Sequence, residues 1–302
     1  MTPDGFLNLL KPPGMTSHDV VAWARSRLGI ARIGHLGTLD PAAAGVLPLS
    51  LGKATRLFDY ASGPDKAYCA EIAFGLQTDT LDAEGAVVAR TDASGLTESA
   101  LRALLPQFMG EIEQIPPAFS SVSVGGRRLY ESARAGTQVV GAPRRVTITQ
   151  LDLVDFTPGS RAYALVDIVC TGGTYIRALA DDLGRAAGCG ACLGFLVRTR
   201  AGRFDLAQSH TLEEVVERLG SGSVEDLILL PDWPLGALPE VVLTDLEALA
   251  FVRGKRVPAA AEPARQVRAY GPDALFLGLG EIADEGVLQP RVVLRSEQEL
   301  PR

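Results

Sequence analysis

Apolar and polar residues recur along the chain with the two periods that mark strands and helices. In 67–75, apolar Tyr68, Ile72 and Phe74 share one face of an alternating pattern, which predicts a strand. Alternation also predicts strands over 145–156 and 162–171, and we further expect a short strand over 6–10 and a strand pair over 192–207. Apolar spacing and capping residues predict helices over 18–28, 53–61 and 97–109, and from about 174 to 188.

These elements follow one another at irregular intervals, which favours an α+β fold: a mixed, largely antiparallel sheet flanked by helices. A stretch rich in proline and glycine at 230–236 predicts a domain boundary, so we expect domains over 1–236 and 237–302. The second segment contains short strands broken by glycines and prolines, which is typical of a small β-barrel.

Composition is that of an ordinary globular protein, with 47% hydrophobic and 22% charged residues. Apolar runs fall short of the roughly 18 residues of a membrane span, and the start lacks the pattern of a signal peptide, so we expect a cytoplasmic protein without membrane attachment. Cys189 and Cys192 form a single Cys-x-x-Cys without a second pair, which favours reduced thiols over a zinc site.

The net charge of −7 argues mildly against a nucleic-acid-binding protein, but the charges are unevenly distributed. Residues 61–100 and 201–237 each carry 2 basic against 7 acidic side chains, whereas 123–145 carries 5 arginines and 1 glutamate. A local basic surface can bind phosphates on an acidic protein, and a solvated arginine-bearing face is the alternative. Arg127 and Arg128 are the candidate phosphate contacts of this segment.

A candidate catalytic carboxylate, Asp40, lies in the glycine-rich run GHLGTLDPAAAGVLPL of residues 34–49. Pro41 pushes the residue before it towards extended geometry, so Asp40 is expected on a loop. A rigid loop with apolar neighbours is a suitable place for a reactive carboxylate. An ordinary Asp-Pro turn is the alternative.

This run resembles the catalytic motif of the TruB-type tRNA pseudouridine synthases, which usually reads GHTGTLDPLATGVLP. Further stretches match that family in the same order: LKPPGMTS at 10–17, DKAY at 65–68, QTDTLD at 77–82, QIPPAFS at 114–120, RLYE at 128–131, GTYIR at 173–177 and GLGEI at 278–282. The resemblance therefore covers nearly the whole chain. It implies a pseudouridine synthase fold followed by a PUA-like RNA-binding domain at the C-terminus.

The implied activity is conversion of uridine 55 in the T loop of tRNA to pseudouridine, with the T arm of tRNA as partner. The reaction breaks the bond between C1′ and N1 and rejoins the base through C5, so it conserves atoms. It implies no cofactor and no metal, and the sequence contains neither a phosphate-binding loop nor a dinucleotide fingerprint. The short bacterial form also implies no guide RNA and no obligate protein partner.

The resemblance assigns roles to several residues by their place in the motifs. Asp40 matches the catalytic aspartate, Arg177 its ion-pair partner, and Tyr68 the aromatic ring that stacks on the target uracil. The remaining matches are substrate contacts: His35 in extruding the base, Leu196 in lining the base pocket, and Lys11 in binding phosphate or supporting the structure.

Four positions depart from the family pattern, and they bear on RNA contact rather than on activity: Leu36, Ser121, Ser123 and Val197. Two other function classes stay open at this stage. A noncatalytic RNA-binding or tRNA-folding protein would not need Asp40. A carboxylate-based glycosidase would need a second carboxylate, for which Asp79, Asp82 or Asp181 could serve.

Overall fold

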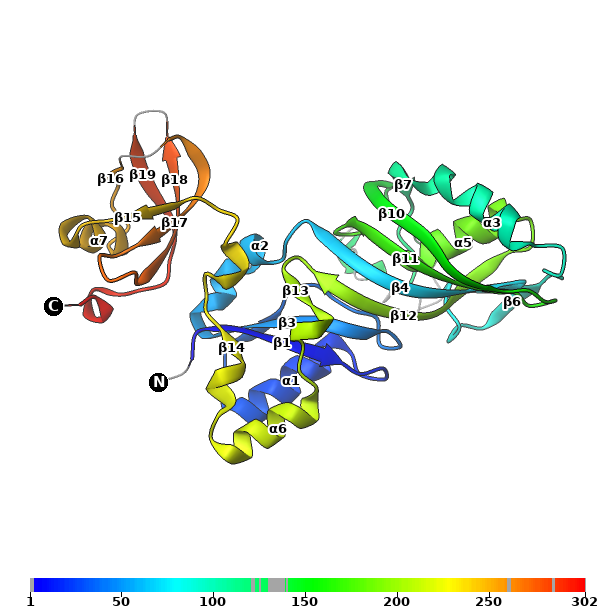
Figure 1. Ribbon diagram of the computed structural model, residues 1–302, viewed down its shortest axis with the longest axis horizontal. Helices are drawn as coiled ribbons and strands as arrows, with labels where there is room; N and C mark the ends of the chain where they lie inside the picture. The colour runs from blue at the N-terminus through cyan, green and yellow to red at the C-terminus, as the bar shows by residue number, and fades with distance from the viewer. Residues whose placement is uncertain are drawn as a thin grey trace.

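The structure is a computed structural model, and it describes residues 3–120, 123–124, 126–129, 139, 141–259, 262–283 and 286–301. These residues form a ten-stranded sheet and a separate five-stranded sheet near the C-terminus, seen at opposite sides of Figure 1. Helices pack on the large sheet, and the smaller C-terminal sheet is curled like half a barrel. The expected α+β fold, with a mixed and largely antiparallel sheet and a PUA-like C-terminal part, is confirmed.

The large sheet has the strand order β14-β1-β3-β12-β4-β11-β10-β7, with β2 paired to β3 and β13 to β12. Its strands are β1 (Gly5–Lys11), β2 (Ile33–His35), β3 (Ala44–Leu51), β4 (Asp65–Phe74), β7 (Gly110–Gln114), β10 (Arg144–Thr157), β11 (Tyr163–Thr171), β12 (Ala191–Ala201), β13 (Phe204–Asp205) and β14 (Ile228–Leu229). Two small hairpins lie outside it: β5 (Leu76–Thr78) with β6 (Val87–Arg90), and β8 (Ser123–Val124) with β9 (Arg127–Arg128).

The only parallel pairing along this order joins β3 to β12, and it divides the sheet into two halves. Gly45 of β3 lies opposite Arg198 of β12, and a Cβ there would stand 2.2 Å from the Arg198 carbonyl oxygen. Its φ of +116° also favours glycine. A side chain at position 45 would therefore force β3 and β12 apart at the place where the two halves meet.

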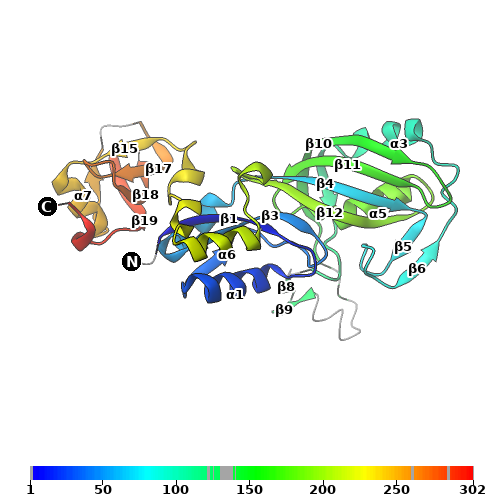
Figure 2. The same cartoon turned by 60° about the horizontal axis from the view of Figure 1, so that its bottom comes forward.

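Each half of the large sheet is covered by its own pair of helices (Figures 1 and 2). On β1 and β3 lie α1 (Ser17–Leu28) and α6 (Leu212–Ser221), whose Val21 and Val215 join Leu9 and Leu49 in one core. On the other half lie α3 (Glu98–Leu104) and α5 (Ile176–Ala186), with the short α2 (Phe58–Ala61) near the β3–β4 connection. Within the described residues, no helix has the length and apolarity needed to cross a membrane.

Local signals explain the helix ends. Thr16 and Asp19 form a capping box at the start of α1, and Gly29 ends it in the left-handed conformation.

The continuous helix predicted over 97–109 is wrong: α3 ends at Leu104 and a 3₁₀ turn follows over Leu105–Phe108. Pro106 lies in that turn and lacks the N–H that an α-helix needs there. Likewise, 53–61 forms a 3₁₀ turn over Gly52–Leu57 followed by the single turn of α2.

The C-terminal sheet has the strand order β15-β17-β18-β19-β16, with α7 (Asp245–Val252) packed beside it. Its strands are β15 (Glu240–Val242), β16 (Val257–Pro258), β17 (Ala264–Tyr270), β18 (Phe276–Ala283) and β19 (Val287–Val293). Apolar residues of this sheet share a core with the large sheet, where Phe276 and Leu279 join Phe6, Leu57 and Phe204. The C-terminal sheet is thus attached by burial of apolar surface.

The stretch predicted as a linker, 230–236, packs against the domains on both sides of it. The Trp233 ring lies 5.2 Å from that of Phe204, and the Arg203 guanidinium lies 5.0 Å from the Trp233 centroid. Tyr270 Oη donates a hydrogen bond of 2.7 Å to Asp232 Oδ2. The division into 1–236 and 237–302 stays a proposal, since the two parts share a core and a hydrogen-bonded connection.

Candidate active site

A cleft of about 670 Å³ lies where the two halves of the large sheet meet. Its wall combines the loop between β2 and β3, the start of α1, one face of β4 and β12, and the start of α5. Asp40, Tyr68, Arg177 and Leu196, which are far apart in the sequence, all line this cleft. The parallel junction of β3 and β12 therefore sets the position of the site.

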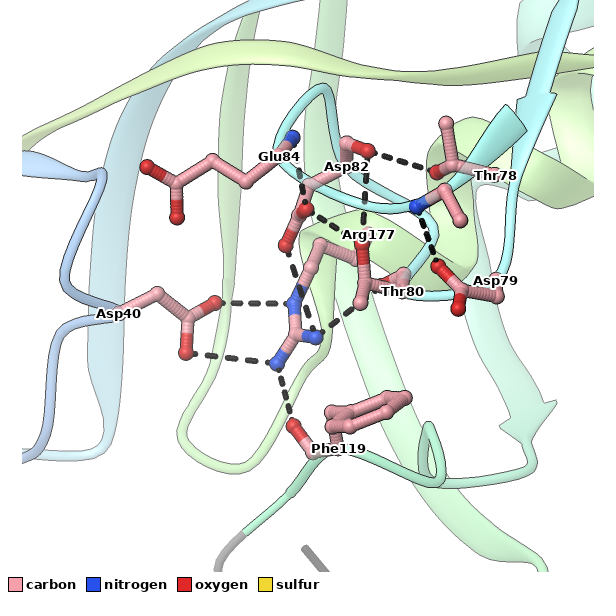
Figure 3. Close-up of polar contacts among 9 residues, drawn as sticks. Asp40, Thr78, Asp79, Thr80, Asp82, Glu84, Phe119 and Arg177 are labelled. Carbon is pink, nitrogen blue, oxygen red and sulfur yellow. Dashed lines mark hydrogen bonds and ion pairs between the residues drawn. The ribbon is translucent and has the colours of Figure 1, made fainter. Parts of the chain in front are cut away.

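Asp40 and Arg177 form the central ion pair of the cleft (Figure 3). Arg177 Nε lies 2.9 Å from Asp40 Oδ2, and Arg177 Nη2 donates to Asp40 Oδ1 at 3.3 Å. The Arg177 side chain is 6% exposed and that of Asp40 is 41% exposed. The guanidinium is therefore enclosed behind the carboxylate, which faces the open space of the cleft.

The rest of the Arg177 guanidinium is bound to the walls. Nη1 donates to the Thr80 carbonyl at 3.1 Å, and Nη2 to the Phe119 carbonyl at 2.9 Å. Asp82 Oδ2 lies 3.8 Å from Nη1, which is close enough for an ion pair but too far for a hydrogen bond (Figure 3). A planar group with donors fixed on several sides has little freedom to rotate, so Asp40 meets a preorganised partner.

Three buried groups hold the loop that carries Asp40. Lys11 is fully buried, and its Nζ donates to the carbonyls of Pro12, Met15 and Pro41 at 2.9, 2.6 and 3.0 Å. Ser17 Oγ accepts from the Leu39 N–H at 2.9 Å. The Lys11 ammonium is thus bound to backbone on both sides of the loop, which supports a structural role over a phosphate contact.

Arg198 is the third support, and reading the sequence did not single it out. It is 1% exposed, and its guanidinium donates to the carbonyls of Gly37, Thr38 and Val46 at 3.0, 3.2 and 2.8 Å. It also contacts the Tyr68 hydroxyl, which lies opposite it across the β4–β12 pairing. The signal available in the sequence was weak: Arg198 directly follows the apolar run FLV of residues 195–197.

Tyr68 is half-buried and lines the cleft on the same face of β4 as Ala70 and Ile72. Burial raises the pKa of its hydroxyl, and the Arg198 guanidinium opposes that rise. The ring is consequently a neutral phenol near pH 7, with a hydrogen-bond donor at its oxygen. Leu196 is 7% exposed and contributes apolar surface nearby.

His35 does not line the cleft, whereas His18 does. The two imidazole rings meet edge to face, with centroids 5.6 Å apart and planes at 76°. Burial lowers the pKa of His35, and the neighbouring His18 and Arg198 lower it further. His35, the histidine predicted from the sequence, therefore lies behind the cleft wall in contact with His18. His18 lines the cleft and was not predicted to do so.

Other predicted residues fall elsewhere. The side chains of Arg127, Arg128 and Ser123 and the whole of Ser121 lie outside the described residues. Leu36 is fully buried in a hydrophobic core and Val197 is half-buried within β12, so neither departure from the family pattern lies on the open surface. The four cysteines are free, and the described residues contain no group of three metal-ligating side chains.

Sequence comparisons match three segments to known families. Residues 25–176 match "TruB family pseudouridylate synthase (N terminal domain)", 177–233 match "tRNA pseudouridylate synthase B C-terminal domain", and 239–294 match "Pseudouridine synthase II TruB, C-terminal". The tRNA pseudouridine synthase B of Symbiobacterium thermophilum is 54% identical over 83% of this chain and 82% of its own length. That of Trichormus variabilis is 43% identical over 96% and 98%.

Solved structures show the same fold. A chain of a Cbf5-Nop10-Gar1 complex superimposes with a TM-score of 0.74 at 26% identity, covering 99% of this chain and 87% of that one. A chain from an archaeal box H/ACA Nop10-Cbf5 complex gives a TM-score of 0.73 at 24% identity, covering 99% and 88%. Both likenesses extend over the two sheets.

Proposed function

The chain belongs to the TruB family of pseudouridylate synthases, and from this premise we propose that it converts uridine 55 in the T loop of tRNA to pseudouridine. It is an isomerase that acts on tRNA. The observation that carries the proposed catalysis is the placement of Asp40, a carboxylate that faces a large cleft while a buried guanidinium holds it at two points.

The reaction rearranges one nucleotide. The bond between C1′ and N1 breaks and its electron pair stays with the uracil. The base turns, C5 forms a bond to C1′, C5 loses its proton, and N1 gains one. The site must therefore stabilise positive charge that develops at C1′, hold the free base, and accept a proton from C5.

Asp40 is the residue we assign to C1′. A carboxylate there can form a bond to C1′ or stabilise the developing positive charge without a bond, and both roles need the same placement. Arg177 fixes that placement through its two contacts and through its bonds to the Thr80 and Phe119 carbonyls. Preorganised charge of this kind costs no reorganisation during the reaction.

Tyr68 and Leu196 are assigned to the base. A base turned out of its helix stacks on aromatic surface and is enclosed by apolar side chains, which these two residues supply on neighbouring strands. The Tyr68 hydroxyl is the candidate acceptor of the C5 proton. The Arg198 guanidinium beside that hydroxyl favours a phenolate, so it lowers the cost of forming the ionised base that such a step requires.

The remaining assignments concern RNA binding. We propose that Arg127 and Arg128 bind tRNA phosphates and that His35 acts on the base through its contact with His18. Lys11 acts by supporting the catalytic loop. The PUA-like segment 237–302 is proposed to bind the tRNA outside the cleft. We also propose that the protein acts in the cytoplasm, on tRNA alone, without guide RNA or a protein partner.

A direct assay tests this function. Purified protein is incubated with an unmodified tRNA transcript in buffer that contains EDTA, and pseudouridine is mapped along the RNA. We expect one pseudouridine, at position 55, without any added RNA or cofactor. Modification at another position only would contradict the proposed target, and the absence of pseudouridine would contradict the activity.

A further inference from the structure

Lys66 is a buried lysine in the wall of the cleft, and the proposed chemistry does not use it. It is 7% exposed and lines the cleft, one alternation along β4 from Tyr68. Alternate residues of a strand face the same side, with Cα atoms about 7 Å apart. Lys66 Cε also lies 3.9 Å from the place a Cβ on Gly37 would occupy. The ammonium therefore reaches beneath the loop that leads to Asp40.

The charges around Lys66 are mostly positive. Arg198 and Arg200 are its cationic neighbours, Asp65 is the neighbouring carboxylate, and the Cys170 thiol completes its surroundings. Burial raises the pKa of Cys170 to about 11, so that thiol stays neutral. Among the described residues, no carboxylate lies within 4 Å of the Lys66 ammonium. Within the part of the chain that the structure describes, the ammonium donates a single hydrogen bond, to the Ser62 carbonyl.

A buried ammonium without an ionic partner is costly, and this cost favours the neutral amine. Burial, followed by the field of Arg198, lowers the pKa of Lys66 to about 8. Arg198 cannot swing away to relieve the repulsion, because three backbone carbonyls hold it. An anion bound beside Lys66 would offset both the desolvation of the ammonium and its repulsion by Arg198.

The proposed function identifies this anion, and the inference rests on it. A uridine stacked on Tyr68 carries a phosphodiester on each side of its ribose, and Lys66 stands one strand alternation away from that ring on the same face. We propose that Lys66 binds a backbone phosphodiester adjacent to the target uridine, within the positive field of Arg198 and Arg200. The cleft would then fix the nucleotide at three places: base, C1′ and phosphate.

Uncharged linkages in the RNA test this contact without altering the protein. T-arm stem-loops are made with one methylphosphonate, either 5′ or 3′ to the target uridine, and their dissociation constants are measured with the full chain. We expect one of the two linkages to weaken binding to the wild type by about tenfold, the size expected of one charge-assisted contact. Equal binding of both modified RNAs and the unmodified RNA would overturn the proposal.

Protein variants then assign the contact to Lys66. Lys66→Gln should bind the unmodified RNA about tenfold more weakly and lose its sensitivity to that linkage, whereas Lys66→Arg should retain it. Lys53→Gln is the matched control, because Lys53 pairs with Glu299 on the surface outside the cleft and should keep the full sensitivity. A Lys66→Gln protein as sensitive as the wild type would show that another group binds the phosphate.

The proposal and the function on which it rests fail in different ways. Pseudouridine formed in the unmodified stem-loop reports the activity, whereas the affinity difference between charged and uncharged linkages reports the phosphate contact. A wild type that forms pseudouridine but does not distinguish the linkages would overturn the Lys66 contact alone.

Discussion

Arg177 holds Asp40 through two separate atoms, Nε at 2.9 Å from Oδ2 and Nη2 at 3.3 Å from Oδ1. The same guanidinium is bound to the carbonyls of Thr80 and Phe119, which belong to two different loops. The orientation of the carboxylate therefore depends on packing of distant segments around one buried arginine.

Replacing Arg177 should slow the chemical step far more than it weakens tRNA binding. Arg177→Lys keeps the charge but loses the two-point contact, and Arg177→Met loses both. A displacement of about 1 Å at a reacting group can cost about 100-fold in rate, so we expect at least that loss in single-turnover experiments at saturating tRNA. Arg185→Met is the control, because Arg185 lies on the same helix but pairs with Asp181 and Asp182. An unchanged rate for Arg177→Lys would contradict the positioning role.

Tyr68 should contribute to binding and chemistry through different parts of its side chain. Tyr68→Phe keeps the ring, so affinity should persist while turnover stops. Tyr68→Leu should in addition lose stacking, worth about 1–3 kcal/mol per base. Dissociation constants and single-turnover rates of both variants separate the two effects. If Tyr68→Phe turns over like the wild type, the hydroxyl has no part in proton removal.

RNA affinity should fall as pH rises through about 8, because the free protein loses the Lys66 proton there. A bound phosphate favours the ammonium, so binding is accompanied by proton uptake above that pH and becomes weaker. Lys66→Arg stays charged throughout this range and should show a flatter profile. The comparison is needed because the pKa of buried Lys11 is also lowered to about 8. Identical pH profiles of the two proteins would contradict a contribution from Lys66.

The C-terminal sheet should unfold together with the rest of the chain. Leu279 is 1% exposed in a core that also contains Phe6 and Phe204. Leu279→Ala should therefore lower the free energy of unfolding by about 2–5 kcal/mol, measured by denaturant titration. Leu246→Ala on α7 is the control, since Leu246 is 80% exposed and should change stability by less than about 0.5 kcal/mol. Two separate transitions in the wild type would show that the parts unfold independently.

Much of the fold could be predicted from local patterns. Strands such as 145–156 and 162–171 alternate clearly because one face of the sheet is buried, and they correspond to β10 and β11. In contrast, β3 was not predicted: it reads AGVLPLSL and is buried almost throughout, so it has no alternation to detect. Helices α6 and α7 were also missed, although each begins with a capping box, Thr211 with Glu214 and Thr244 with Glu247.

The site residues that lie in recognisable sequence motifs could be predicted. Asp40, Tyr68 and Arg177 were named from the sequence, and the structure places all three around one cleft. Arg198 was not named from the sequence, and Lys66 was given no role although it lies in the matched DKAY stretch, since the importance of both depends on burial and on neighbours across the sheet. Lys11 shows the converse: its motif was visible, but only its three carbonyl contacts indicate what the ammonium does.

The central claim is that the Asp40 carboxylate performs the chemistry, and Asp40→Asn tests it most directly. Asparagine keeps the size of the side chain and removes its charge, so tRNA binding should remain close to that of the wild type. The account predicts that pseudouridine mapping of a single-turnover reaction, with variant protein in excess over unmodified tRNA, finds no pseudouridine at position 55. Formation of pseudouridine there at the wild-type rate would contradict the account.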